Sequence, residues 1–299
     1  MEEVIHPRQS AVVPSTAPRR DALEIVYTPN GARRNGVGGW GMMLSELAQS
    51  RRLIWLLVLR DISARYRQSL LGYAWAIIPQ IITVATFAFL NAWRVIPIGD
   101  TRIPYVPFVL WGLSVWQLFA GCLTACTGSL VSGGALVTKV NFPRESLVIA
   151  ALGQPVFDFC VRLLPVVAVF VWYGVAPSWG MLFLPFVLVA VLSLALGLGM
   201  ILAVANLVIR DTANALGMIL TVGMFLTPVL YPAPVRWPFF LINLLNPLSP
   251  LLNASQDLIA VSVITQPEMF ATSCGLSILL ALGAWRAFHV AIPRVAGYA

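Results

Sequence analysis

Residues that could support catalysis or bind a metal ion are few in this sequence and far apart. The candidates are four cysteines and two histidines: Cys122, Cys126, Cys160, Cys274, His6 and His289. Cys122 and Cys126 share one face of a predicted helix, but no histidine or acid in that helix completes the set of ligands that a metal site needs. We therefore expect no catalytic residue and no metal site, and we expect the cysteines to be packing residues.

The sequence also has no phosphate-binding loop. Such a loop needs glycines followed by Lys-Ser or Lys-Thr at a fixed spacing. Residues 131–139 (VSGGALVTK) contain glycine and lysine, but at a different spacing. Any nucleotide hydrolysis linked to this chain must therefore take place in another chain, and we expect no cofactor here.

The composition indicates that most of the chain contacts lipid. Of its 299 residues, 59% are hydrophobic and 10% are charged, whereas an average soluble domain has about 25% charged residues. A water-soluble fold of this chain would lack the polar residues to cover its surface. Basic residues that face anionic headgroups explain the net charge of +7, so we expect no nucleic-acid partner.

The long apolar stretches predict an all-α fold with six membrane-spanning helices. A helix needs roughly 20 apolar residues to cross the hydrocarbon core. The stretch after Glu145 is broken at residues 174–178 (GVAPS), which indicates two spans joined by a tight turn. The predicted spans are residues 69–93, 104–134, 147–173, 181–208, 212–231 and 269–289.

The segments outside the spans differ in composition. Residues 1–38 are polar and rich in proline and glycine, which predicts a flexible cytoplasmic tail, whereas residues 39–299 form one transmembrane domain. Residues 39–68 contain a short apolar run flanked by arginines, which predicts an amphipathic helix along the membrane surface. Residues 232–267 are apolar but interrupted by prolines, which predicts short re-entrant helices on the outer face.

The distribution of basic residues predicts that both termini are cytoplasmic. In this topology most of the 19 lysines and arginines lie inside, as in most membrane proteins. Only Arg94, Arg102 and Arg236 lie outside, and Arg162 lies within a span. The loop at residues 137–146 is then cytoplasmic.

Two groups of charged residues could have functional roles. Arg60, Arg65 and Arg67 could bind a lipid diphosphate, because guanidinium groups bind phosphate oxygens bidentately. Anchoring at lipid headgroups explains these arginines equally well. Asp158 and Arg162 lie one helical turn apart within a span, so we expect them to pair with each other, although a role in gating is also open.

Several motifs together resemble those of one transporter family. They are LRDISARYRQSLLGYAWAIIPQ at residues 59–80, LVTKVNFPRES at 136–146, LVIRDTANAL at 207–216, TPVLYP at 227–232 and LNPLSP at 245–250. In this order they resemble the transmembrane subunit of type-2 ABC exporters, the family that exports O-antigen, capsule and teichoic acid polymers. The resemblance extends from about Glu24 to the C-terminus.

The resemblance implies a machine of several subunits in the bacterial inner membrane. Two copies of the chain would form a channel for a lipid-linked polysaccharide, and two copies of a separate ATPase would bind ATP and Mg²⁺. The loop at residues 137–146 would dock on the ATPase through Phe142, with Arg144 and Glu145 at its charged rim. The other expected ATPase-coupling residues are Lys139, Pro143, Arg210 and Asp211. An ordinary positively charged cytoplasmic loop is the less favoured alternative.

Aromatic residues and the proline-rich segment complete the expected substrate path. Sugar rings stack on aromatic side chains, so we expect the channel to be lined by Tyr73, Trp75, Phe87, Phe89 and Tyr231, although aromatic residues also serve in packing and at membrane interfaces. The external gate would include Asn246, Pro247 and Asp257. A drug or small-lipid exporter of the same superfamily and, less favoured, a polytopic membrane transferase are the alternatives.

Overall fold

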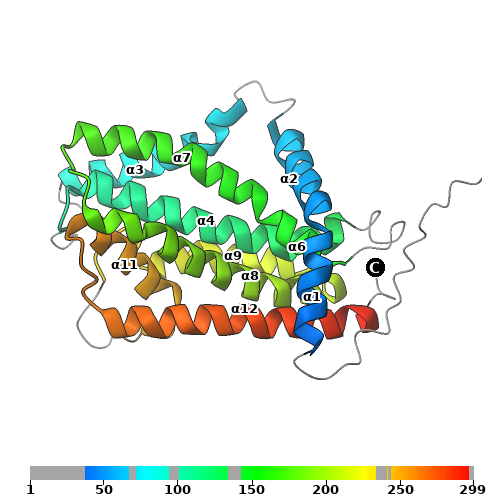
Figure 1. The fold of residues 1–299 in the computed structure, drawn as a ribbon. Helices are drawn as coiled ribbons and strands as arrows, with labels where there is room; N and C mark the ends of the chain where they lie inside the picture. The colour runs from blue at the N-terminus through cyan, green and yellow to red at the C-terminus, as the bar shows by residue number, and fades with distance from the viewer. Residues whose placement is uncertain are drawn as a thin grey trace, which may run out of the picture.

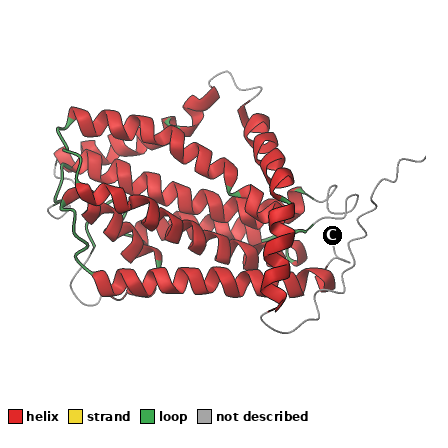
Figure 2. Ribbon diagram, viewed as in Figure 1, coloured by secondary structure: helices red, strands yellow, loops and turns green. Residues whose placement is uncertain are grey.

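Helices form all of the regular structure in the part of the chain that the computed structural model describes. The described residues are 38–66, 72–93, 101–133, 143–233, 241 and 244–295. They contain no strand (Figure 2), which confirms the predicted all-α class. The elements are α1 (Gly38–Gln49), α2 (Arg51–Tyr66), η2 (Gly72–Ala76), α3 (Ile78–Ala92), α4 (Tyr105–Ser132), α6 (Glu145–Ala151), α7 (Gly153–Trp172), η3 (Trp179–Phe183), α8 (Leu184–Val208), α9 (Thr212–Leu226), α11 (Leu248–Ala260) and α12 (Pro267–Val295).

Long helices that run along a common axis form the body of the molecule. α4, α7, α8 and α12 lie lengthwise, α1 and α2 cross one end, and α11 lies at the opposite end (Figure 1). α8 packs against both α4 and α12. The molecule therefore has two distinct ends, and different segments of the sequence meet at each.

Glycines in α8 permit this close packing. A Cβ atom at Gly199 would collide with the Cβ atom of Cys126 in α4, and a Cβ atom at Gly197 would lie 2.9 Å from the backbone nitrogen of Ala281 in α12. Small residues at such contacts are typical of membrane bundles, because they let helix backbones approach closely.

Five helical segments of the described residues are long and apolar enough to cross a membrane. They are Ala74–Ala92, Tyr105–Ser132, Glu145–Trp172, Trp179–Val208 and Pro267–Ile292, and each overlaps a predicted span. The remaining predicted span, residues 212–231, contains α9, which has 15 residues. At 1.5 Å per residue α9 extends about 22 Å, less than the roughly 30 Å of a hydrocarbon core.

The surface of the bundle carries large apolar side chains, as a chain in lipid requires. Trp172 and Trp179, on either side of the turn between α7 and α8, are 87% and 86% exposed. Tryptophan is enriched where a membrane meets water. The many apolar helices and exposed apolar side chains identify a multi-pass membrane protein.

The segment predicted to form one interfacial helix contains two helices. α1 and α2 are separated by a turn at Ser50. α2 packs against α6 and α7, where a Cβ atom at Gly153 would lie 2.5 Å from both methyl groups of Val58. Trp55 and Leu56 lie on the exposed side of α2. The predicted tail, residues 1–38, lies outside the described residues except for Gly38.

The segment predicted to be re-entrant, residues 232–267, contains the buried helix α11. Leu251 and Leu252 are fully buried, and α11 packs against α4, α8 and α12. Residues 234–240 and 242–243 lie outside the described residues. α11 is therefore part of the protein core at its end of the bundle.

Candidate functional site

A buried carboxylate joins α2 to α7. Asp158 in α7 is 3% exposed. The hydroxyl group of Tyr66, the last residue of α2, donates to its Oδ1 atom, and Arg65 Nη1 lies 3.8 Å from its Oδ2 atom. The side-chain oxygen of Gln154, one turn earlier in α7, accepts a hydrogen bond from Arg65 Nε at 3.1 Å. A buried carboxylate needs such partners, and they fix the end of α2 on α7.

Tyr66 is protonated at physiological pH. Burial and the hydrogen bond to Asp158 raise its pKa from the ordinary 10.0 to about 12. The phenol group therefore keeps its proton near neutral pH and can donate it to Asp158.

The predicted pair of Asp158 and Arg162 has different partners in the structure. Asp158 takes its donors from α2, whereas Arg162 Nε donates to the carbonyl oxygen of Ala76 at 3.0 Å. The short aspartate side chain is satisfied where α2 approaches, and the longer arginine side chain reaches the backbone just before α3. Arg162 therefore joins α7 to the start of the first candidate span.

These side chains line a cavity of about 450 Å³ beside α4. Its charged residues within the described part of the chain are Arg65, Asp158 and Arg162, so positive charge exceeds negative charge. The side chain of Arg65 is 51% exposed. Because guanidinium groups bind phosphate oxygens, the cavity could hold a phosphate group.

A second arginine of the predicted phosphate contact, Arg60, is not among the residues that line this cavity. Arg60 forms an exposed ion pair with the adjacent Asp61 at 2.8 Å. Arg67 lies outside the described residues. Within the described residues, only Arg65 of the predicted group faces the polar cavity.

The described end of the predicted coupling loop, residues 143–146, enters α6 and contacts α12. The carbonyl oxygen of Pro143 accepts a hydrogen bond from the Ser146 N–H at 3.0 Å, and α6 begins at Glu145. Glu145, predicted at an exposed rim, is instead 8% exposed and lies 2.5 Å from His289 Nδ1. His289 supplies the partner that makes this burial possible. Lys139 and Phe142 lie outside the described residues.

The second predicted coupling loop is exposed and held to α4. Arg210 and Asp211 lie on the surface between α8 and α9. The nearby Asn206 is buried; its amide donates to the Thr127 carbonyl oxygen, and its Oδ1 accepts from the Ala213 N–H, both at 3.2 Å. These contacts fix the loop relative to the bundle.

The predicted channel-lining aromatic residues lie in different surroundings. Trp75 and Phe89 are 56% and 60% exposed, whereas Phe87 packs against the core. Tyr231 is half-buried, and its hydroxyl group donates to the Phe225 carbonyl oxygen at 2.8 Å. The side chain of Tyr73 lies outside the described part of the chain. Trp75 and Phe89 are thus available to a substrate, lipid or second copy.

The predicted gate residues hold α11 in place. Asn246 Nδ2 donates to Thr227 Oγ1 at 2.7 Å, and Asn246 Oδ1 accepts from the Leu248 N–H at 3.1 Å. Pro247 immediately precedes α11. They fix the start of α11 beside the chain that follows α9.

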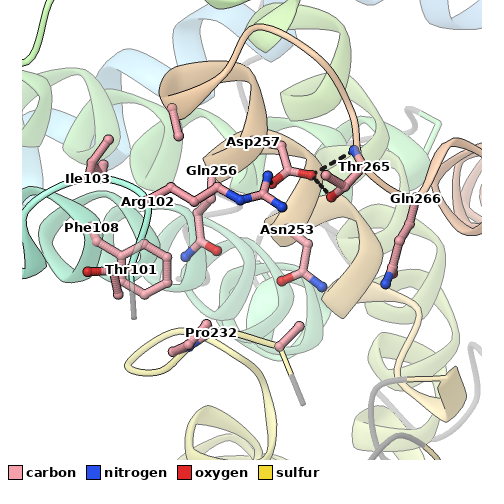
Figure 3. A pocket seen from close by; sticks show the side chains of 12 residues that line it. Thr101, Arg102, Ile103, Phe108, Pro232, Asn253, Gln256, Asp257, Thr265 and Gln266 are labelled. Atoms are coloured by element: carbon pink, nitrogen blue, oxygen red, sulfur yellow. Dashed lines mark hydrogen bonds and ion pairs between the residues drawn. The ribbon is translucent and has the colours of Figure 1, made fainter. Parts of the chain in front are cut away.

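An ion pair holds the other end of α11. Arg102 Nη1 lies 2.6 Å from Asp257 Oδ1, and Asp257 Oδ2 accepts from the backbone N–H of Thr265 at 2.9 Å (Figure 3). These contacts join α11 to the loop before α4 and to the loop before α12.

The sequence did not indicate three of these partners. Tyr66, Gln154 and His289 contact residues that were predicted to be functional. In a chain with only 10% charged residues, each buried charge needs a partner. This requirement is the only indication in the sequence that such partners exist. It does not say which of several distant residues the fold brings close.

The arrangement is that of a multi-pass membrane protein, with apolar spans, polar contacts at both ends and a cavity lined by Arg65, Asp158 and Arg162 where α2 meets α7. The family model of the ABC-2 type transporter matches residues 52–259, and this chain belongs to that family. It is 28% identical to the O-antigen export system permease protein RfbA of Myxococcus xanthus over 242 residues, which cover 80% of this chain and 92% of the relative. It is 26% identical to a protein of that name from Klebsiella pneumoniae over 234 residues, which cover 73% and 87%.

Proposed function

We propose that this chain is the permease subunit of an ATP-driven exporter that carries a lipid-linked polysaccharide across the cytoplasmic membrane of a bacterium. The observation that carries this proposal is its alignment with O-antigen export permeases over most of their length. The chain is a transport subunit and not an enzyme; a separate ABC ATPase binds ATP and Mg²⁺ and hydrolyses the nucleotide.

The proposed topology has six spans and two cytoplasmic termini. α9 together with residues 227–231 forms the fifth of these spans in chain order. The other five spans are long enough by themselves. The excess of basic residues near α1, α2 and the loop before α6 supports the orientation. α1 and α2 then lie at the cytoplasmic surface, and α11, with residues 232–267, forms the external gate.

Coupling to the ATPase is proposed to pass through α6. The loop of Lys139, Phe142, Pro143 and Arg144 docks on the ATPase, with Arg210 and Asp211 in a second contact. Because Glu145 at the start of α6 contacts His289 of α12 at 2.5 Å, movement of the loop is transmitted to a long helix. The exporter would alternate between two conformational states. ATP shifts the equilibrium between them only to the extent that it binds one state more tightly than the other.

Two copies of the chain are proposed to enclose the polymer. The exposed side chains of Trp75 and Phe89 suit a channel wall or a contact with the second copy. Arg65 is proposed to bind the diphosphate of the lipid carrier, and its position at the cavity where α2 meets α7 supports this role.

The test compares surface polymer in cells that carry the native chain or a Phe142→Ala, Arg144→Ala variant. The control is Arg52→Ala, which removes an exposed arginine near the start of α2. We expect the double variant to insert normally, to lose the bound ATPase on purification and to export little polymer, while the control behaves like the native chain. Normal export by cells that lack this chain would contradict the proposal.

A further inference from the structure

A second cavity (Figure 3) lies beside α11. α11 is at the end of the molecule away from α1 and α2 (Figure 1). The volume of the cavity is about 370 Å³, within the roughly 300–1,000 Å³ of small-molecule sites. It lies between α11, the loop before α4 and the chain that follows α9. None of the functional contacts described above requires a cavity here.

Two side-chain amides that line this cavity have unused hydrogen-bonding atoms. Gln256 is 7% exposed, and its Nε2 donor has no partner among the described residues. The Oε1 acceptor of Gln266, on the loop before α12, is also buried and has no partner there. Buried polar atoms are almost always paired in folded proteins. Both atoms have less than 1 Å² of exposed surface, so each can bind a ligand only when its amide group turns toward the cavity.

The position of the Gln256 amide depends on a glycine in α4. A Cβ atom at Gly112 would lie 3.2 Å from Gln256 Nε2 and 2.7 Å from the Val229 carbonyl oxygen. Only a residue without a side chain leaves room for both. The Nε2 group of Gln256 thus packs closely against the backbone of α4.

The charges of the cavity indicate a neutral ligand. Among the described residues that line it, Arg102 and Asp257 are the only charged ones. They pair with each other at 2.6 Å, so neither a cation nor an anion finds an unpaired counter-charge. Phe108 and Pro232 add apolar surface. Amide groups can bind hydroxyl groups, and here they lie beside apolar surface. This combination suits a sugar ring, because such a ring has a polar edge and an apolar face.

We infer that the cavity lined by Gln256, Gln266, Phe108 and Pro232 binds one neutral sugar residue of the exported polymer at the external end of the channel. This inference rests on the proposed function, which supplies both the polymer and the orientation. Binding at this position would hold the polymer after it leaves the membrane and oppose its return.

The test measures binding of the methyl glycosides of neutral hexoses and 6-deoxyhexoses to the purified complex of this chain and its ATPase in nanodiscs, by saturation-transfer NMR. Gln256→Met keeps the side-chain length and removes the donor, and Gln266→Met removes the acceptor on a loop. Gln49→Met makes the same change on an exposed amide of α1. Retention of the ATPase shows that each variant is folded.

We expect at least one glycoside to bind the native complex and the Gln49 variant. We expect affinity to fall about tenfold in each cavity variant, the effect of losing one hydrogen bond. Equal binding by all variants, or no binding of any glycoside, would overturn the inference. Polymer export by the native complex, measured in parallel, separates this failure from failure of the proposed function.

Discussion

The contact of Tyr66 with Asp158 should stabilise the junction of α2 and α7 more than the contact of Arg65 with the same carboxylate. Asp158 is 3% exposed, and the Tyr66 hydroxyl group donates to it. Arg65 lies at 3.8 Å, and its side chain is 51% exposed. Replacing each residue in turn, as Tyr66→Phe and Arg65→Ala, separates the two contacts.

The expected magnitudes differ because of burial. A hydrogen bond to a charged group contributes about 1.5–3 kcal/mol in soluble proteins and less, about 0.6–1.7 kcal/mol, between membrane helices. We therefore expect Tyr66→Phe to lower the free energy of unfolding by about 1–2 kcal/mol. An exposed ion pair contributes about 0.2–1 kcal/mol, and a long one belongs at the lower end. Arg65→Ala should therefore cost less than about 0.5 kcal/mol.

The assay is equilibrium unfolding in mixed detergent–SDS micelles, followed by tryptophan fluorescence. The cost of Tyr66→Phe should fall by at least half when Asp158 is replaced by Asn. The folded-state pKa of Tyr66 is raised from 10.0 to about 12, so its contribution is complete below pH 10 and is lost as the pH rises toward 12. The costs of Tyr66→Phe measured from about pH 6 to about pH 9 should therefore agree. A larger cost for Arg65→Ala than for Tyr66→Phe would refute this reasoning.

Two further predictions concern α4 and α6. Gly112→Ala should lower the free energy of unfolding by about 1–3 kcal/mol, because its Cβ atom would lie 2.7 Å from the Val229 carbonyl oxygen. Gly128→Ala, which meets open space in the same helix, should be neutral or stabilising by up to about 1 kcal/mol in the same unfolding assay; equal costs would contradict the packing. His289→Ala should lower ATPase activity that depends on this chain, because buried Glu145 loses its partner at 2.5 Å. Adding Glu145→Gln to His289→Ala should recover at least half of the lost ATPase activity, because it removes the unpaired charge. No recovery in the double variant would count against the contact.

The spans could be predicted from the sequence because lipid imposes a simple rule. A crossing helix needs about 20 apolar residues, and the five segments that meet this rule in the structure all overlap predicted spans. The break within residues 39–68 was not predicted. Ser50 forms a turn there, and no proline or glycine next to it signals the interruption. α9 is short because the turn that begins at Thr227 ends it.

The partners of the charged residues could not be predicted, because they depend on contacts between distant segments. Spacing along one helix suggested Asp158 with Arg162. The fold instead brings Tyr66, which is 92 residues away in the chain, to Asp158. Glu145 and His289 are 144 residues apart, and a local pattern carries no information about such a pair. The motifs that identified the family are local, and this is why the family was recognisable.

The central claim, ATP-driven export of a lipid-linked polymer through this chain, is tested most directly in inverted membrane vesicles. Their cytoplasmic face is outside, so added ATP and labelled lipid-linked polymer reach the proposed entry. The account predicts accumulation of polymer in the lumen that requires ATP, this chain and its ATPase, and that falls sharply in the Phe142→Ala, Arg144→Ala variant. Accumulation that continues without ATP, or in vesicles that lack this chain, would contradict it.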